Sequence, residues 1–414
     1  MTRRSRFKSQ SGFLVGCHHY SSSAPSLKLN RALLVSKLSR YELESLRFKD
    51  IDQTQLEKKL RDRGSDYELL IHHHEVHKSF EKSVLANALV VLSSTAEDGE
   101  IEVQISVRFK LTQDDISWAD VVFSLGGDGT FLMVASSVLG NSKPVVGFNS
   151  DPTRSEGHLC LPKRYSTNLE EAIYKLTHGE FKWMFRSRIR ITLSGEFIDE
   201  QPVELQEELL HPDRRFSLII YNCNVAPDEK RVFINSALPE STRVLPVFAL
   251  NEVFLGESLS ARVSYFELSL DGGPFTKIKS SGLCVTTGTG STSWHLSINR
   301  VDQQTVAKLA TLLGNKLSPE QVPAITKSYN DSLVFSPENP QISYTIRDNI
   351  CASVWPHPKG IESRGFASQI VIRSRCFDAV LVIDGRVSFK FNDGTVAKLE
   401  IHESDSLRTV TLNE

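Results

Sequence analysis

Short apolar runs separated by polar, helix-like stretches organise the first half of the chain. Residues 31–38 (RALLVSKL) predict a first buried strand, and residues 101–107 (IEVQISV) predict another. The clearest unit follows, with a strand at 121–125, a glycine-rich turn, a helix from Thr130 onward and a further strand at 144–149 (PVVGFN). Strand, turn, helix and strand form a βαβ unit, which predicts a parallel sheet covered by helices.

The helix that follows the glycine turn has recognisable start and stop signals. Thr130 can cap its amino end, and Gly140 is expected to end it. Its predicted apolar face consists of Phe131, Leu132, Ala135, Val138 and Leu139.

After about residue 186 the pattern changes to short segments in which apolar and polar residues alternate. Examples are RIRITL, VSYFELSL, ISYTI, QIVIRS and VSFKF. Asp271-Gly272-Gly273 and Asp384-Gly385 lie between pairs of such segments and predict hairpin turns, so this half is expected to be antiparallel and β-rich. Residues 195–245 are polar with weak periodicity, and we interpret most of them as an insertion or mobile loop.

A chain of 414 residues is too long for one small core, so more than one domain is expected. The patterns predict an α/β domain with a parallel sheet over residues 28–185 and a β-rich domain over residues 186–378. Residues 379–414 form a C-terminal segment with the Asp384-Gly385 hairpin, and a return of this segment to the N-terminal domain is left open.

Composition narrows the class of protein. A formal net charge of −2 provides no basic field for nucleic acid or acidic membranes, and no apolar run approaches the roughly 18 residues that span a bilayer. The six cysteines show no C-x-x-C spacing, which argues against a disulfide framework or a zinc ribbon and suits a reducing compartment.

The first 27 residues are basic and serine-rich, and no acidic residue precedes Glu42. This composition is typical of a mitochondrial transit segment, and a disordered basic tail is the alternative. We therefore assign residues 1–27 to targeting.

Residues 121–136 (VVFSLGGDGTFLMVAS) contain the strongest chemical signal. Glycines between a strand and a helix let backbone N–H groups approach a phosphate, but a bound phosphate would repel Asp128. The carboxylate is better explained if it faces a nucleophilic hydroxyl, as phosphoryl transfer requires. The alternative is a tight turn with an exposed Asp, and the string alone is shared by several groups of kinases.

Two polar clusters follow in the β-rich half. Asn251 and Glu252 interrupt an apolar segment and can reach one ligand only at a bend or strand end; an edge strand with a solvated Glu is the alternative. Residues 284–300 (CVTTGTGSTSWHLSINR) form a hydroxyl-rich loop, after which the indole of Trp294 can stack on a planar ring or simply belong to the core.

In this order the three motifs resemble the NAD kinase family, and within it the animal mitochondrial branch, from about residue 31 to the C-terminus. The resemblance implies a fold shared with diacylglycerol kinases. It also implies phosphorylation of the adenosine ribose 2′-hydroxyl of NAD to NADP, with ATP as donor and Mg²⁺ or another divalent cation. A homodimer or larger oligomer and a location in the mitochondrial matrix are implied as well, with the β-rich domain binding NAD.

The resemblance also assigns roles to individual residues, with Asp128 as the catalytic carboxylate and no protein ligand to a metal predicted. The other implied ligand-binding residues are Gly126, Gly127, Gly129, Thr130, Asn149, Asn251, Glu252, Thr289, Gly290, Ser291, Thr292, Ser293, Trp294, Ser297, Asp384 and Gly385.

The chain departs from the family pattern at several positions. Gly288 stands where the family loop T-P-T-G-S-T-A-Y has proline, and Trp294 where it has tyrosine. A lipid kinase of the diacylglycerol or sphingosine type, a phosphofructokinase-type enzyme and a non-catalytic NADP-binding protein remain alternatives. His73 and His77 of HHHEVH could share a metal, although a partly exposed helix face is the simpler interpretation.

Overall fold

The computed structural model describes most of the chain outside its N-terminal segment and several internal stretches. The described residues are 27, 30–95, 102–107, 110–196, 198, 200–205, 242–315, 317–350 and 361–412. The predicted transit segment therefore lies outside the described residues, apart from Leu27.

The first half forms the predicted parallel sheet. Its strand order is β2-β1-β3-β4, with β1 at Arg31–Ser36, β2 at Glu102–Val107, β3 at Val121–Gly126 and β4 at Val145–Asn149, all paired in parallel. The helices of this part are α1 (Arg40–Arg47), α2 (Gln53–Asp62), α3 (Tyr67–Thr95), α4 (Gln113–Trp118), α5 (Asp128–Ser137), α6 (Arg164–Thr167) and α7 (Leu169–Thr177).

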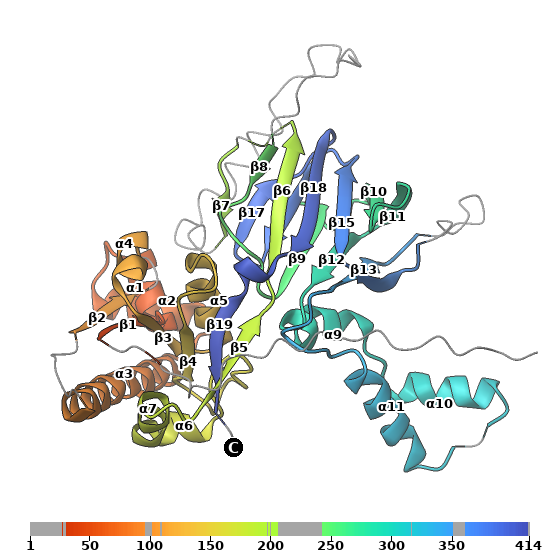
Figure 1. Cartoon of the computed structure of the whole chain (residues 1–414). Coiled ribbons are helices and arrows are strands. Elements are labelled where there is room, and N and C mark those ends of the chain that lie inside the picture. The colour runs from red at the N-terminus through yellow and green to blue at the C-terminus, as the bar shows by residue number, and fades with distance from the viewer. Residues whose placement is uncertain are drawn as a thin grey trace, which may run out of the picture.

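One apolar cluster joins the sheet to α3 and α7, and a second joins it to α4 and α5. The sheet is thus covered by helices, and the glycine loop and the segments after β1 and β4 meet at its carboxyl edge (Figure 1). Within the described part of the chain, no helix combines the length and apolar character needed to cross a membrane.

Helix α5 differs from its prediction at both ends. It begins at Asp128 with Gly127 as its N-cap, so Thr130 lies inside the first turn and the prediction that it caps the helix is wrong. The helix ends at Ser137, and Leu139 is 50% exposed, so Leu139 does not belong to the buried face. Gly140 does follow as a turn residue, with φ at 72°.

The second half forms the expected antiparallel, β-rich part, built from two sheets. The first has the order β11-β10-β15-β18-β6-β8 and the second the order β14-β13-β12-β9-β16-β17-β7. Their strands are β6 (Ile189–Gly195), β7 (Val203–Glu204), β8 (Thr242–Val244), β9 (Glu252–Glu257), β10 (Ser264–Leu270), β11 (Thr276–Ser280), β12 (Gly282–Thr286), β13 (Ile342–Arg347), β14 (Arg364–Ala367), β15 (Gln369–Ser374), β16 (Ala379–Ile383), β17 (Val387–Lys390) and β18 (Thr395–Ile401). Buried aliphatic side chains of both sheets form one core between them.

Short helices follow β12. They are the 3₁₀ turn η3 (Gly290–Thr292), α9 (Trp294–Asn299), α10 (Gln303–Leu312) and α11 (Gln321–Asp331). Helices α10 and α11 pack on each other and extend away from the two sheets (Figure 1).

Both predicted hairpin turns are confirmed. Asp271 and Gly272 connect β10 to β11 with φ of 50° and 75°, and Asp384 and Gly385 connect β16 to β17 with φ of 50° and 62°. Positive φ at consecutive residues matches the twist of a tight hairpin and favours the Asp-Gly pair. At the described ends of 195–245, β7 adds a strand to the second sheet and β8 adds one to the first. Residues 206–241 lie outside the described residues, so the interpretation of most of this stretch as an insertion or loop stays a prediction.

The chain returns to its first half at the end. Strand β19 (Leu407–Thr411), which follows the 3₁₀ turn η4 (Glu403–Asp405), pairs with β5 (Lys182–Arg186). Leu407 belongs to the apolar cluster beneath α5, and Val410 to the cluster on the other face of the parallel sheet. Figure 1 shows β19 and β5 side by side between the two halves.

Arg188 joins the two halves at the carboxyl end of α5. Its Nη1 donates to the carbonyls of Ala135 at 3.0 Å and Val138 at 2.6 Å, and its Nη2 donates to Gly140 at 3.0 Å. Its Nε donates to the carbonyl of Asp405 at 2.5 Å. The side chain is completely buried, and this burial lowers the pKa of the guanidinium to about 10, which leaves it charged at neutral pH. A cation at the carboxyl end of a helix is favourable.

We expect Arg188→Met to lower the free energy of unfolding by at least about 3 kcal/mol, because several buried carbonyls lose their donor. Urea denaturation of the full chain measures the effect. Arg262→Met is the matched control, because the Arg262 side chain is 50% exposed. Equal midpoints for Arg188→Met and the wild type would contradict the assigned role.

Candidate active site

The glycine loop is confined between its neighbours at the end of β3. A Cβ on Gly126 would lie 2.3 Å from Thr130 Oγ1 and 3.1 Å from Lys37 Cβ, so no larger residue fits there. The loop leads directly into α5, whose first N–H groups have no partner within the helix. This geometry suits backbone recognition of an anion.

Asp128 is the first residue of α5, and its carboxylate faces the loop that follows β4. Its Oδ1 accepts from the N–H of Leu159 at 2.8 Å, and its Oδ2 accepts from the N–H of His158 at 3.2 Å. Two carboxylate oxygens offer about four acceptor positions, so the group is oriented and can still accept a further hydrogen bond. Among the described residues, none forms an ion pair within 4 Å of this carboxylate.

Asn149, at the end of β4, shapes the loop that holds Asp128. Its Nδ2 donates to Ser155 O at 3.0 Å, and its Oδ1 accepts from Asp151 N at 3.1 Å. The side chain of Asn149 also lies against Gly157, whose φ of 67° favours glycine. Asn149 therefore supports the loop from which His158 and Leu159 donate.

Asn251 and Glu252 lie at the start of β9, which satisfies the expectation that both can serve one ligand only at a strand end. The carboxylate of Asp384 accepts the N–H groups of Leu250 at 2.9 Å, Asn251 at 2.8 Å and Glu252 at 3.0 Å. The Asp384-Gly385 hairpin thus fixes the backbone conformation of the Asn-Glu pair.

The side chains of this pair retain unpaired polar atoms. Asn251 Nδ2 donates to Ser293 Oγ at 3.3 Å, but among the described residues the buried Asn251 Oδ1 and Glu252 Oε2 have no hydrogen-bond partner. Burial, followed by the nearby Asp384 charge, raises the pKa of Glu252 to about 8. Burial also raises the pKa of Asp384 to about 6 in spite of its three backbone donors. Buried polar atoms without partners are uncommon, and here they mark a place for a polar ligand.

The loop after β12 packs closely on the Asn-Glu pair. Thr286 Oγ1 donates to Asn251 O at 2.9 Å, and a Cβ on Gly290 would lie 2.2 Å from the same carbonyl oxygen. A Cβ on Gly288 would lie 1.8 Å from Ser336 O, on the segment after α11. The departure from the family's proline at Gly288 therefore coincides with a close approach of that segment.

The predicted residues of this loop divide into buried and accessible groups. Ser291 is buried and its Oγ donates to Gly288 O at 2.7 Å, whereas Thr292 and Ser297 are exposed. Thr289 is buried beside Arg186. The ring of Trp294 lies 4.7 Å from that of Phe254 at 33°, so Trp294 is packed on one side and partly accessible.

Arg186 is a site residue that we did not predict from the sequence. Its Nη1 donates to Thr289 Oγ1 at 3.3 Å, and its Nε is buried with no hydrogen-bond partner in the part of the chain that the structure describes. Burial lowers the pKa of Arg186 to about 10, and the negative charge of Asp128 opposes that shift. Arg186 therefore lies between the glycine loop and the loop after β12. The sequence feature that could have indicated Arg186 is the alternation of arginines at 186, 188 and 190 at the start of a strand.

The histidines of HHHEVH occupy α3, as predicted, but His77 is not on an exposed face. It is completely buried, and its Nε2 contacts Ser36 Oγ and Lys37 O at 3.1 Å each. Burial lowers the pKa of His77 to about 4. In the described residues, no group of three or more His, Cys, Asp or Glu side chains is arranged to hold a metal ion.

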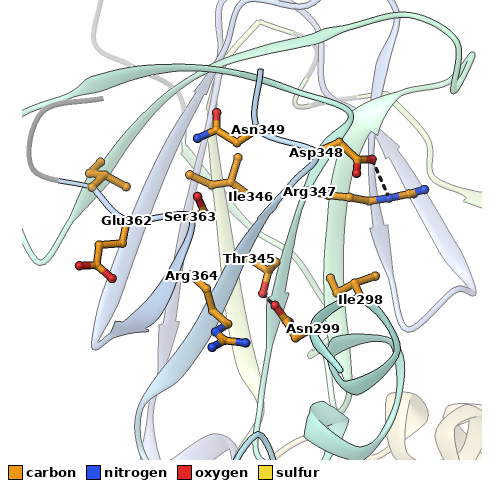
Figure 2. A pocket seen from close by; sticks show the side chains of 11 residues that line it. Ile298, Asn299, Thr345, Ile346, Arg347, Asp348, Asn349, Glu362, Ser363 and Arg364 are labelled. Carbon is orange, nitrogen blue, oxygen red and sulfur yellow. Dashed lines mark hydrogen bonds and ion pairs between the residues drawn. The ribbon is translucent and has the colours of Figure 1, made fainter. Parts of the chain in front are cut away.

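A cavity of about 990 Å³ lies elsewhere, on β13 and β14 beside α9. Figure 2 shows its lining, which includes Asn299, Arg347 and Arg364. None of the described residues predicted for the site lines this cavity.

The structure brings the glycine loop, the Asn-Glu pair and the hydroxyl-rich loop to one place between the two halves. Leu250, immediately before the pair, belongs to the same apolar cluster as Phe131 and Val134 of α5. A glycine loop at the carboxyl edge of a parallel sheet, faced by unpaired polar groups of a second domain, defines a protein that binds a phosphate-containing ligand such as a nucleotide.

Comparisons identify the family. No protein-family model matches the chain. The protein named NAD kinase 2, mitochondrial, of Rattus norvegicus is 42% identical over 393 residues, covering 93% of this chain and 88% of that protein. The protein of the same name from Homo sapiens is 41% identical over 420 residues, covering 100% of this chain and 90% of that protein. The crystal structure of yeast NADH kinase complexed with NADH is 16% identical, covers 92% of this chain and 84% of that chain, and has a TM-score of 0.49.

At these identities over nearly the full length, the chain belongs to the NAD kinase family. The resemblance expected from the three motifs is confirmed.

The raised pKa of Glu252 predicts a pH-dependent stability. Between the ordinary value of 4.5 and about 8, the folded protein keeps a proton that the unfolded chain has released. Stability should therefore fall as the pH rises through this range, and Glu252→Gln should make the fall less steep. Urea denaturation at a series of pH values measures the slopes. The exposed Glu180→Gln should follow the wild type, and parallel curves for Glu252→Gln would argue against a buried, protonated Glu252.

Proposed function

We propose that this chain is an NAD kinase that transfers the γ-phosphoryl group of ATP to the 2′-hydroxyl of the adenosine ribose of NAD, giving NADP, in the mitochondrial matrix. The relatives named mitochondrial NAD kinase support the reaction and the organelle. The observation that carries the proposal is the position of Asp128 at the end of the glycine loop. Its carboxylate is oriented by the N–H groups of His158 and Leu159. The Asn-Glu pair, with Asn251 Oδ1 and Glu252 Oε2 unpaired among the described residues, lies across from it.

The Asn-Glu pair would bind the adenosine part of NAD. The free Oδ1 of Asn251 and Oε2 of Glu252 can accept hydrogen bonds from ribose hydroxyls or a base amino group. The accessible side of Trp294 can stack on a ring, with Thr292 and Ser297 exposed nearby on the same segment. Asp384 and Ser291 would support these groups, and Asn149 the loop that holds Asp128, rather than touch the ligand, because their polar atoms bond to the protein.

Asp128 would act as general base. It would accept the proton of the 2′-hydroxyl while that oxygen attacks the γ-phosphorus of ATP. Arg186 lies close enough to Asp128 for their charges to interact, and its unpaired Nε can donate to a phosphate oxygen. The narrow loop around Gly126 and Gly127 would bring backbone N–H groups to the phosphate.

A divalent cation such as Mg²⁺ would enter with the ATP phosphates, because Mg²⁺ commonly uses substrate phosphates and one or two carboxylates. When bound, it would neutralise charge on the transferring phosphoryl group. Asp128 is the carboxylate of this chain that the arrangement offers to it.

We further propose that the α/β half has a diacylglycerol kinase-like fold and that the protein forms a homodimer or a larger assembly.

One assay separates this proposal from its alternatives. The purified chain is incubated with ATP, magnesium and either NAD or diacylglycerol, and NADP is read with a coupled dehydrogenase. NADP formation supports the proposal. Phosphorylation of the lipid would favour the lipid kinase, and binding of NADP without turnover would favour a non-catalytic protein.

Asp128→Asn should lower kcat about 100-fold or more, since loss of a general base typically costs 10²–10⁴. Equilibrium binding of NAD should remain measurable, because the Asn-Glu pair is unchanged. Asp114→Asn, at an exposed position in α4, is the matched control and should keep wild-type turnover. A near wild-type rate for Asp128→Asn would refute the assigned role.

A further inference from the structure

The short segment of residues 336–338 (Ser-Pro-Glu), between α11 and β13, contacts two separate parts of the candidate active site. The first part is the hydroxyl-rich loop. Ser336 O lies so close to Gly288 that a Cβ there would be 1.8 Å away, and Phe335 N donates to Ser291 Oγ at 3.2 Å. The segment is thus packed directly on this loop.

The second part is strand β5, which ends at Arg186. Within the described residues, β5 pairs with β19 alone, so its other edge has no partner strand. On that edge, Phe185 N donates to Glu338 Oε1 at 2.9 Å, and Ser187 N donates to Pro337 O at 2.8 Å. These two N–H groups belong to the residues on either side of Arg186. The segment therefore fixes the backbone of Arg186 from both sides.

The carboxylate of Glu338 is held in place by its own turn. Glu338 N donates to Ser336 Oγ at 3.2 Å, and Asn339 N donates to Ser336 O at 3.0 Å. Glu338 is nevertheless exposed, and exposed side chains usually contribute little to the free energy of unfolding. Its hydrogen bond to Phe185 is better explained by what it does to the position of β5.

The side chain of Arg186 is the part of β5 that such a position would serve. Arg186 Nη1 donates to Thr289 Oγ1, and Arg186 lies near enough to Asp128 and Glu338 for their negative charges to oppose the lowering of its pKa by burial. Glu338 thus acts on Arg186 in two ways, through the backbone of Phe185 and through its own charge.

We propose that Glu338 is a positioning residue, which holds Arg186 in the orientation that places its guanidinium between Asp128 and the hydroxyl-rich loop. The proposal rests on the proposed kinase function, in which Arg186 donates to a phosphate oxygen. Glu338 would not touch either substrate. It would act through Arg186, and its loss would affect the phosphoryl transfer more than the binding of NAD.

The first test uses variants of Glu338 in the full chain that separate length from charge. Glu338→Ala should lower kcat about tenfold, and Glu338→Gln, which keeps an oxygen that can accept from Phe185, should stay within about threefold of the wild type. Glu338→Asp keeps the charge but is one methylene shorter, so it should lose turnover almost as Glu338→Ala does. It decides the test if Glu338→Ala does not fold. Equilibrium binding of NAD should change less than about twofold in each variant.

A double-mutant cycle shows whether the effect passes through Arg186. In the Arg186→Met background, Glu338→Ala should change kcat less than about twofold, because two residues that act as a unit are not additive. The same cycle is measured by equilibrium binding of magnesium-ATP. Arg186→Met should weaken that binding about tenfold and Glu338→Ala about threefold, with the double variant equal to Arg186→Met.

Glu320→Ala is the matched control, because Glu320 is exposed before α11 and its side chain makes no capping hydrogen bond, so wild-type kcat is expected. Wild-type kcat in Glu338→Ala, or an equal loss from Glu338→Ala with and without Arg186, would overturn the proposal. If the wild type forms no NADP, the kinase function is refuted and the ATP-binding cycle decides the role of Glu338. A loss of ATP affinity that requires Arg186 then supports the proposal, and an additive or absent loss overturns it.

Discussion

The arrangement of this molecule depends on holding helix α5 at both of its ends. At the carboxyl end, Arg188 and Arg386, both from the β-rich half, donate to carbonyls of the last turns. At the amino end, the carboxylate of Asp128 accepts N–H groups from the loop after β4. The helix therefore cannot shift along its axis without losing charge-assisted hydrogen bonds at one end. This constraint places Asp128 relative to the second domain.

In the β-rich half, a single carboxylate, that of Asp384, fixes the backbone before β9 in a comparable way. Asp384 accepts three consecutive N–H groups from Leu250 to Glu252 and thereby sets the entry into β9. The backbone is held by Asp384, and among the described residues Asn251 Oδ1 and Glu252 Oε2 have no hydrogen-bond partner. An oriented strand end with free acceptors is what a binding site for hydroxyl and amino groups requires. Burial, with the nearby charge of Asp384 adding to it, raises the pKa of Glu252 to about 8.

Local sequence patterns predicted correctly those elements whose conformation depends on neighbouring residues. The strand at 121–125 and the Asp-Gly hairpins follow from periodicity and turn chemistry. Local sequence patterns did not predict features that depend on contacts between distant parts of the chain. The N-cap of α5 is Gly127, and Thr130 instead lies inside the first turn, close to Gly126. Arg186 is positioned by the pairing of β5 with β19, more than two hundred residues away in the sequence. No local pattern reports such a contact.

The charged groups of the candidate site differ between its two sides. In the β-rich half, the buried carboxyls of Glu252 and Asp384 lie close enough for their charges to interact, and burial raises the pKa of each. On the β1 side of the glycine loop, Lys37 and Arg154 are close enough for their charges to interact, and the nearby Asp151 partly offsets their repulsion. Asp128 and Arg186 form an acidic and a basic group whose charges interact between these two sides. In the proposed reaction, an acidic group would face the hydroxyl that loses its proton and a basic group would face the phosphate, so that neither side chain would oppose the charge of its substrate.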